Sequence, residues 1–297
     1  MYDICCIGHI TLDKVITNRG EKHMAGGTSF YFSNALRNMD VNYCLVTALA
    51  ASEIRFVEEL RAMGTEVIAL PSKHTVYFEN NYADSLDHRT QRVLQTADPF
   101  SVDELRNVNA DIFHLGPLLA DDIPLALIKE LGGRARISLD VQGYLRKVED
   151  KQVQAVDWEE KKEALQYVEI VKADESELQV LTATNSVRRG AEMLAEWGVK
   201  EVVITFNSKG SLVYANNIFY DIPAFVPAVE TDATGCGDTY MAGYLYQRVK
   251  GASVQDAGEF GAAMASLKIE SSGPFTGTKE AVLLQMEKSK TYNTTIN

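Results

Sequence analysis

The sequence predicts an α/β fold in which helices flank a mostly parallel central sheet, with a small β lid beside it. Short β-branched runs alternate with longer amphipathic runs, which is the pattern of a parallel sheet covered by helices. Several amphipathic runs end in glycine, as helix C-caps do. The predicted strands are 2–9, 41–49, 111–116, 135–140, 168–173 and 199–206, and the predicted helices are 29–39, 52–64, 122–133 and 186–198. Residues 243–273 are also expected to be helical, with small residues on their faces.

One region departs from this alternation. Residues 74–100 give two β-rich segments around a polar turn with no helix between them, which predicts a hairpin. Together with 9–18 it would form a small antiparallel platform outside the main sheet. We therefore expect a single domain, 1–297, with a lid formed by about 9–24 and 74–96 over a site at the strand ends.

Composition narrows the function classes. The 297 residues are 46% hydrophobic with mixed charges, which is typical of a soluble globular protein. A net charge of −12 without long like-charged blocks argues against a nucleic-acid surface. The start of the chain has no basic segment, and no run reaches about 18 apolar residues, so we expect a cytoplasmic protein that does not bind membranes.

The four cysteines have neither CxxC spacing nor a histidine at metal-ligand spacing, which argues against a zinc site or a disulfide framework. Cys5, Cys6 and Cys44 are expected to be small core residues. Cys236 lies in the segment with the strongest chemical pattern. A thiol at a helix N-terminus can be nucleophilic, but no histidine lies near it in the sequence.

That segment is "DATGCGD", residues 232–238, followed by a helix-forming run. Gly235 and Gly237 permit turn conformations, so the N–H groups of Gly235, Cys236 and Gly237 would point outward and form an anion cradle at the helix start. An acid there would repel a bound phosphate unless it had another task, so Asp238 is interpreted as a general base. The alternative is an acid that only stabilises the helix dipole.

"DATGCGDTYMAG" resembles the C-terminal signature of the PfkB (ribokinase-like) family of sugar and nucleoside kinases, usually Asp-Thr-x-Gly-Ala-Gly-Asp-x-Phe. "CCIGHITLD" and "HMAGGTSFYFSNAL" match earlier segments of the family in order. The resemblance implies a ribokinase-like three-layer fold. It also implies ATP- and Mg-dependent phosphorylation of a sugar, cyclitol or nucleoside hydroxyl, with Asp238 as the base.

Two other function classes are compatible with parts of the sequence. A non-catalytic sugar- or nucleotide-binding regulatory protein could share this fold, but Asp238 and the cradle are both present. A dinucleotide-dependent oxidoreductase would need G-x-G-x-x-G after the first strand, where "GHITLD" stands instead. No G-x-x-x-x-G-K-[ST] motif appears either, so a P-loop is not expected.

On the acceptor side, the resemblance assigns Asp13 to substrate hydroxyls and Gly26 with Gly27 to close approach of the backbone, although an ordinary loop before a helix would also explain the glycines. Tyr31 stands where many sugar kinases have Asn, and Asn34, one turn further on, is the candidate substitute. "FENNYADSLDHRTQRVLQTADP" and "SLDVQGYLR" are similar to a subgroup with inositol-kinase-like members. That likeness implies that five residues lie near the lid or the cleft: Arg89, Gln91, Asp140, Gln142 and Arg146.

On the donor side, "EIVKADESELQVL" occupies the place of the family's magnesium-organising Asn-x-x-Glu. It offers Asp174 and Glu177 to magnesium, with Lys172 and Asp174 in the ATP site, although a capping box would also explain the two acids.

The segment "VVITFNSKGSLVY" resembles a nucleotide-binding turn through Thr205 and Gly210, with Asn207 replacing a glycine. By the same resemblance, Asp232, the first acid of "DATGCGD", would support the loop of that segment or bind a monovalent cation such as K⁺. A homodimer through the lid strands is expected by resemblance.

Overall fold

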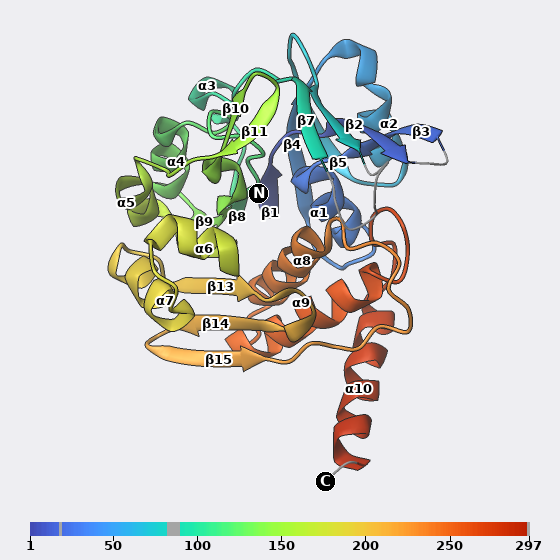
Figure 1. Cartoon of the computed structure of the whole chain (residues 1–297), viewed down its shortest axis with the longest axis vertical. Helices are drawn as coiled ribbons and strands as arrows, with labels where there is room; N and C mark the ends of the chain where they lie inside the picture. Colours follow the sequence, from blue (N-terminus) through green and yellow to red (C-terminus); the bar gives the residue numbers. More distant parts are fainter. Residues whose placement is uncertain (18–19, 82–89, 296–297) are drawn as a thin grey trace.

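Two β-sheets organise the chain in this computed structural model, which describes residues 1–17, 20–81 and 90–295. The main sheet has nine strands in the order β15-β14-β13-β12-β9-β8-β1-β4-β5 (Figure 1). Strands from β13 to β5 pair in parallel, whereas β14 and β15 are antiparallel. The bounds are β1 Tyr2–Ile7, β4 Tyr43–Leu49, β5 Glu66–Pro71, β8 Ala110–Leu115, β9 Arg136–Asp140, β12 Ile170–Asp174, β13 Glu201–Thr205, β14 Ser211–Ala215 and β15 Ile218–Ile222.

Helices cover both faces of this sheet. One face packs against α1 Thr28–Leu36, α2 Arg55–Ala62, α8 Cys236–Val249, α9 Val254–Lys268 and α10 Lys279–Thr295. The other packs against α3 Val102–Leu105, α4 Leu125–Gly132, α5 Lys161–Ala164, α6 Glu175–Thr182 and α7 Val187–Glu196. The chain also contains short 3₁₀ helices, which are η1 Ala51–Glu53, η2 Val141–Leu145, η3 Leu165–Tyr167 and η4 Asn207–Lys209.

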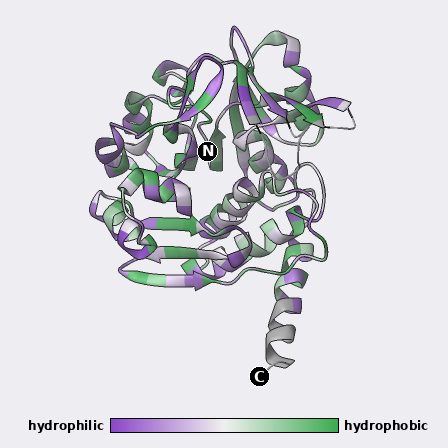
Figure 2. Ribbon diagram, in the orientation of Figure 1, coloured by the Kyte–Doolittle hydropathy of each residue, from purple (hydrophilic) through white to green (hydrophobic). Residues whose placement is uncertain are grey.

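Strand β1 shows why three layers form. Its side chains alternate between two apolar clusters, with Ile4 and Cys6 in one and Cys5 and Ile7 in the other. A strand covered on both faces reads as a continuous apolar run, because neither face meets water. Figure 2 shows the same apolar character in the green segments along β13 and β14.

The second sheet has six strands in the order β10-β11-β7-β6-β2-β3. Its strands are β2 Thr11–Thr17, β3 Gly20–Gly26, β6 Val76–Asn81, β7 Thr90–Gln95, β10 Arg146–Glu149 and β11 Gln152–Ala155. The predicted 9–24 and 74–96 segments supply four of them. The expectation of a purely antiparallel platform was wrong, because β2 pairs with β6 in parallel, and the β10–β11 hairpin was not predicted.

The predicted fold class is confirmed, and each predicted strand and helix of the main body is present. Residues 243–273 do not form one continuous helix: α8 and α9 are separated by a turn in which Gly251 has a φ of 81°. Strands β5, β14 and β15 were not predicted. Among the described residues, no helix has the length and hydropathy needed to cross a membrane.

Candidate active site

Helix α8 begins at the glycine-rich turn that the sequence singled out. Gly235 has a left-handed φ of 79°, and a Cβ there would lie 2.1 Å from Cδ1 of Tyr31. Both constraints require glycine. A Cβ on Gly237 would lie 3.5 Å from Nζ of Lys172, so this backbone runs beside a buried ammonium. The Cys236 N–H donates to the Ala233 carbonyl at 3.1 Å, so it points back into the turn and not outward as predicted.

Asp238 is the third residue of α8 and is only partly accessible to solvent. Burial raises the pKa of its carboxyl to about 6, and the negative charges of Asp140 and Glu177 act in the same direction. Lys172 and a hydrogen bond with Thr28 oppose the shift. A carboxyl with this pKa is ionised near neutral pH and still basic enough to accept a proton.

The carboxyl ends of β9 and β12 bring the neighbouring charges together. Nζ of Lys172 lies 3.0 Å from Oδ2 of Asp140 and 3.7 Å from Oε2 of Glu177. The Gln142 amide donates to Glu177 at 3.2 Å. Against the effect of burial, the two carboxylates raise the pKa of Lys172 above its usual value, so it stays charged. Lys172, Asp140, Gln142, Glu177 and Asp238 therefore form one cluster, called here the acidic cluster.

Asp174 and Glu177 also form the capping box that was the alternative interpretation. The Asp174 N–H donates to Oε2 of Glu177, and the Glu177 N–H donates to Oδ1 of Asp174, both at 2.7 Å. This reciprocal pair fixes the start of α6. It also fixes Glu177 facing Lys172, so the cap and a role in the site are compatible.

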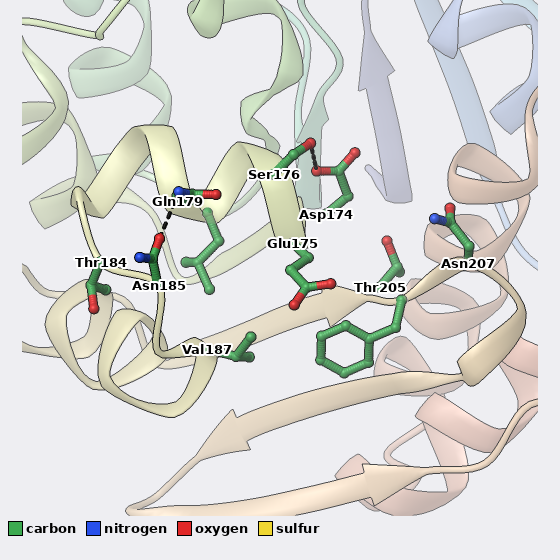
Figure 3. Close-up of a pocket in the computed structure, with 11 residues that line it drawn as sticks. Asp174, Glu175, Ser176, Gln179, Thr184, Asn185, Val187, Thr205 and Asn207 are labelled. Carbon is green, nitrogen blue, oxygen red and sulfur yellow. Dashed lines mark hydrogen bonds between the residues drawn. The ribbon is translucent and has the colours of Figure 1, made fainter.

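A pocket of about 420 Å³ lies beside this cluster, between α6, the start of α7 and the end of β13 (Figure 3). Asp174 and Thr205 line it from paired positions at the ends of β12 and β13, and Asn207 adjoins them. Gly210 is not among its lining residues: its φ is 95° and a Cβ would lie 2.3 Å from the Ile222 carbonyl oxygen, so this glycine shapes the β13–β14 turn.

The second sheet presents Asp13 on the face that packs toward the main body. Cross-strand pairing puts Asp13 beside Phe78, and Phe78 contacts Leu118 and Leu119 in an apolar cluster. Oδ1 of Asp13 accepts from the Thr11 hydroxyl at 2.6 Å. A Cβ on Gly26 would lie 2.4 Å from Oδ2 of Asp13, so glycine at 26 leaves room for this carboxylate.

Gly27 has a φ of 88° and precedes α1, whose first residue, Thr28, contacts Asp238. Gln91 lies on the same face as Asp13 and donates to Oδ1 of buried Asn80 at 2.9 Å. The Asn34 amide donates to the Phe30 carbonyl of its own helix at 2.9 Å and is buried, so the structure does not bring it into the cluster. Arg89 lies outside the described residues. Arg146 begins β10 in the second sheet.

Cys5, Cys6 and Cys44 are buried in the core as predicted, and all four cysteines are free. Burial raises the pKa of the Cys236 thiol to about 11, and its Sγ contacts the Ala265 carbonyl at 3.7 Å. A thiol in this state is a poor nucleophile.

Two residues beside the turn were not found from the sequence. Thr28 reaches Asp238 from α1, and Lys268 reaches Asp232 from the end of α9. The only sequence signal for Lys268 is a lysine closing the small-residue run "GAAMASLK". Both contacts join segments far apart in the sequence, which local patterns do not show.

Comparisons with known proteins agree on one family. Residues 64–281 match the pfkB family of carbohydrate kinases. A cytidine kinase of Thermococcus kodakarensis is 28% identical over 272 residues, covering 88% of this chain and 94% of the relative. An inositol 3-kinase of Arabidopsis thaliana is 23% identical over 280 residues, covering 91% of this chain and 74% of the relative.

A solved structure agrees in fold. A pyrophosphate-dependent kinase of the ribokinase family, complexed with a pyrophosphate analog and myo-inositol, superposes with a TM-score of 0.83 at 28% identity, covering 95% of this chain and 99% of that one. Fold and site together therefore define a kinase of the ribokinase fold. The chain belongs to the pfkB family of carbohydrate kinases.

Proposed function

We propose that this protein transfers a phosphoryl group from ATP, with Mg²⁺, to a hydroxyl of a small polyhydroxy molecule. The observation that carries the proposal is Asp238, a carboxyl with a pKa raised to about 6 in the first turn of a glycine-initiated helix. Phosphoryl transfer depends mainly on positioning and on charge stabilisation, with one group to orient the nucleophile.

In this mechanism each residue of the site has a separate role. Asp238 accepts the proton of the acceptor hydroxyl. The oxygen of that hydroxyl forms a bond to the terminal phosphorus of the donor, and the bond from this phosphorus to the leaving phosphate oxygen breaks. The N–H groups of Gly235 and Gly237 and the Lys172 ammonium stabilise the negative charge on the transferring group. Asp13 holds acceptor hydroxyls from the second sheet, which excludes water when it covers the site.

The acidic cluster carries excess negative charge that a divalent cation beside it would neutralise. Asp140, Glu177 and Asp238 face the single ammonium of Lys172, so full ionisation leaves two excess negative charges. Mg²⁺ needs only one or two carboxylates beside phosphate oxygens and water, and Glu177 with Asp174 would supply them. Bound there, Mg²⁺ would neutralise charge on the donor phosphates.

The acceptor is a sugar, a cyclitol or a nucleoside. The relatives named above act on cytidine and inositol, and the neighbouring structure holds myo-inositol. Asp13, Asn80 and Gln91 share one face of the second sheet and offer acceptors and donors suited to several hydroxyls.

Pyrophosphate is the second candidate donor, because a structural neighbour at 28% identity is pyrophosphate-dependent. The N–H groups of Gly235 and Gly237, the Lys172 ammonium and a bound Mg²⁺ would hold its phosphates in the same way. The two donors differ only in the need for a nucleotide pocket, for which Thr205 and Asn207 are the candidates.

The test is a matrix of two donors against a panel of acceptors. Purified protein with Mg²⁺ and either ATP or pyrophosphate is given myo-inositol, cytidine, other nucleosides, ribose, fructose or 2-keto-3-deoxygluconate, and the phosphorylated product is identified by mass spectrometry. We expect one acceptor to stimulate ATP turnover strongly in the parent and not in Asp238→Asn.

Turnover with pyrophosphate and an acceptor, but not with ATP, would change the proposed donor and leave the proposed roles of the residues unchanged. ATP binding without turnover on any acceptor would favour the non-catalytic binding protein. Absence of binding to either donor would overturn the proposal.

A further inference from the structure

A buried lysine stands where a monovalent cation was expected. Lys268, the last residue of α9, has no solvent-exposed surface. Its Nζ donates to the Asp232 carbonyl at 2.7 Å and lies 3.5 Å from the Ser271 carbonyl oxygen and 3.7 Å from Oδ2 of Asp232. Backbone carbonyls with one carboxylate are the oxygen ligands that a hard cation such as K⁺ would use.

The surrounding loop is built around this ammonium. The N–H groups of Thr231 and Asp232 donate to the Ile269 carbonyl at 2.8 and 3.2 Å, which joins the loop to the end of α9. A positive charge is also stabilised at a helix C-terminus by the helix dipole. Against the effect of burial, hydrogen bonds from Thr234 and the charge of Lys268 hold the pKa of Asp232 below its usual value.

The same ammonium reaches the cradle through Tyr31. Nζ of Lys268 lies 6.0 Å from the centroid of the Tyr31 ring, within the range of a cation–π contact. That ring occupies the space where a Cβ on Gly235 would lie. Lys268 therefore holds both the loop that precedes the turn and the side chain that packs against it.

We propose that the Lys268 ammonium replaces a dissociable K⁺ ion next to the anion cradle, so that phosphoryl transfer by this protein does not depend on monovalent cations. Asp232 and its loop thus fit a tethered ammonium and do not fit K⁺ while Lys268 is present. Lys268 is a positioning residue, since it acts through the Asp232 loop and Tyr31. The inference rests on the proposed function only where turnover is the readout.

The first arm uses the unmodified protein. Its rate and its melting temperature are measured in buffers of equal ionic strength containing K⁺, Na⁺ or tetramethylammonium. We expect the rate to change by less than about twofold between them, because a tethered cation is not diluted. Activation of the parent severalfold by K⁺, or stabilisation of the parent by K⁺ but not Na⁺, would overturn the inference.

The second arm is Lys268→Ala, which removes the ammonium. We expect a rate loss of about tenfold or more, in keeping with hydrogen bonds to charged groups, and partial rescue by K⁺ or NH₄⁺ but not by tetramethylammonium. K⁺ should also raise the melting temperature of this variant and leave the parent unchanged. Lys250→Ala is the control, since that lysine is exposed at the end of α8 and should show no response to K⁺.

These readouts separate the possible failures. Loss of rate in Lys268→Ala without rescue by any small cation would mean that Lys268 is only structural and would overturn the inference. If Lys268→Ala does not fold, Lys268→Met keeps the aliphatic stem, and the parent arm still decides. If no acceptor is found, the proposed function fails, whereas the melting temperatures still test the cation site.

Discussion

Lys172 and Lys268 are both buried beside the start of α8, and their surroundings differ in kind. Lys172 faces two carboxylates, those of Asp140 at 3.0 Å and Glu177 at 3.7 Å. Lys268 donates to the backbone carbonyl of Asp232 at 2.7 Å and lies near that of Ser271, with the Asp232 carboxylate further away at 3.7 Å. The difference indicates that Lys172 belongs to the acidic cluster of the candidate site, whereas Lys268 mainly holds the backbone of the loop before α8.

The largest effect is expected on the acidic side, from Asp238→Asn. Loss of a general base lowers the rate by about 10²- to 10⁴-fold. The measurement is the initial rate at saturating donor and acceptor. Asp256→Asn is the matched control, because Asp256 is the third residue of the neighbouring helix α9 and only assists its cap. Equal rates for the two variants would remove Asp238 from the chemistry.

The next effect is on stability. Lys172→Met leaves Asp140 and Glu177 buried without their cation, and breaking such a pair lowers the free energy of unfolding by about 3–5 kcal/mol. Urea unfolding measures it. Lys200→Met is the control, since its pair with Glu169 at 2.7 Å is exposed on the lysine side and should contribute only about 0–1 kcal/mol. Similar losses in both variants would contradict the assignment of Lys172 to a buried cluster.

The dependence of kcat/KM on pH should reflect the protonation of Asp238 in the acidic cluster. The Asp238 pKa of about 6 makes the carboxyl increasingly protonated as pH falls, and a protonated base cannot accept the acceptor's proton. We therefore expect kcat/KM to fall by about tenfold per pH unit below that value and to level off above it. Asp238→Asn should lose this step. A profile flat down to pH 4 would show that the carboxyl is not the titrating base.

The smallest effect is expected from Cys236→Ala. The thiol is protonated and packed against α9, so we expect the rate to change by less than about twofold, and alkylating reagents to leave the parent active. Inactivation of the parent by iodoacetamide, with protection by the donor, would restore a chemical role for Cys236.

The sequence predicted the main sheet better than the second sheet, for a physical reason. Strands such as β1 and β13 are covered on both faces, so they appear as apolar runs that can be recognised locally. The β10–β11 hairpin consists of "RKVE" and "QVQA", whose polar composition gives no strand signal. The parallel pairing of β2 with β6 joins segments that are far apart in sequence.

The site shows the same division. Asp238 and its glycines lie within seven residues, so the turn at the helix start could be predicted from their spacing, and the role of Asp238 as a base from the resemblance to the family signature. The contact between Lys268 and Asp232 spans 36 residues and depends on how α9 packs against α8. The Asn34 amide is used within its own helix, because its place on α1 is buried, which spacing along the sequence could not indicate.

A cation that is part of the chain has no dissociation equilibrium. A bound K⁺ would leave on dialysis and would compete with Na⁺, so the shape of its loop would follow the medium. The Lys268 ammonium is at its position in every folded molecule, and its occupancy is set by folding alone. The loop before α8 is therefore insensitive to the ionic composition of its surroundings, and anything that unseats the end of α9 would release the cation and the turn together.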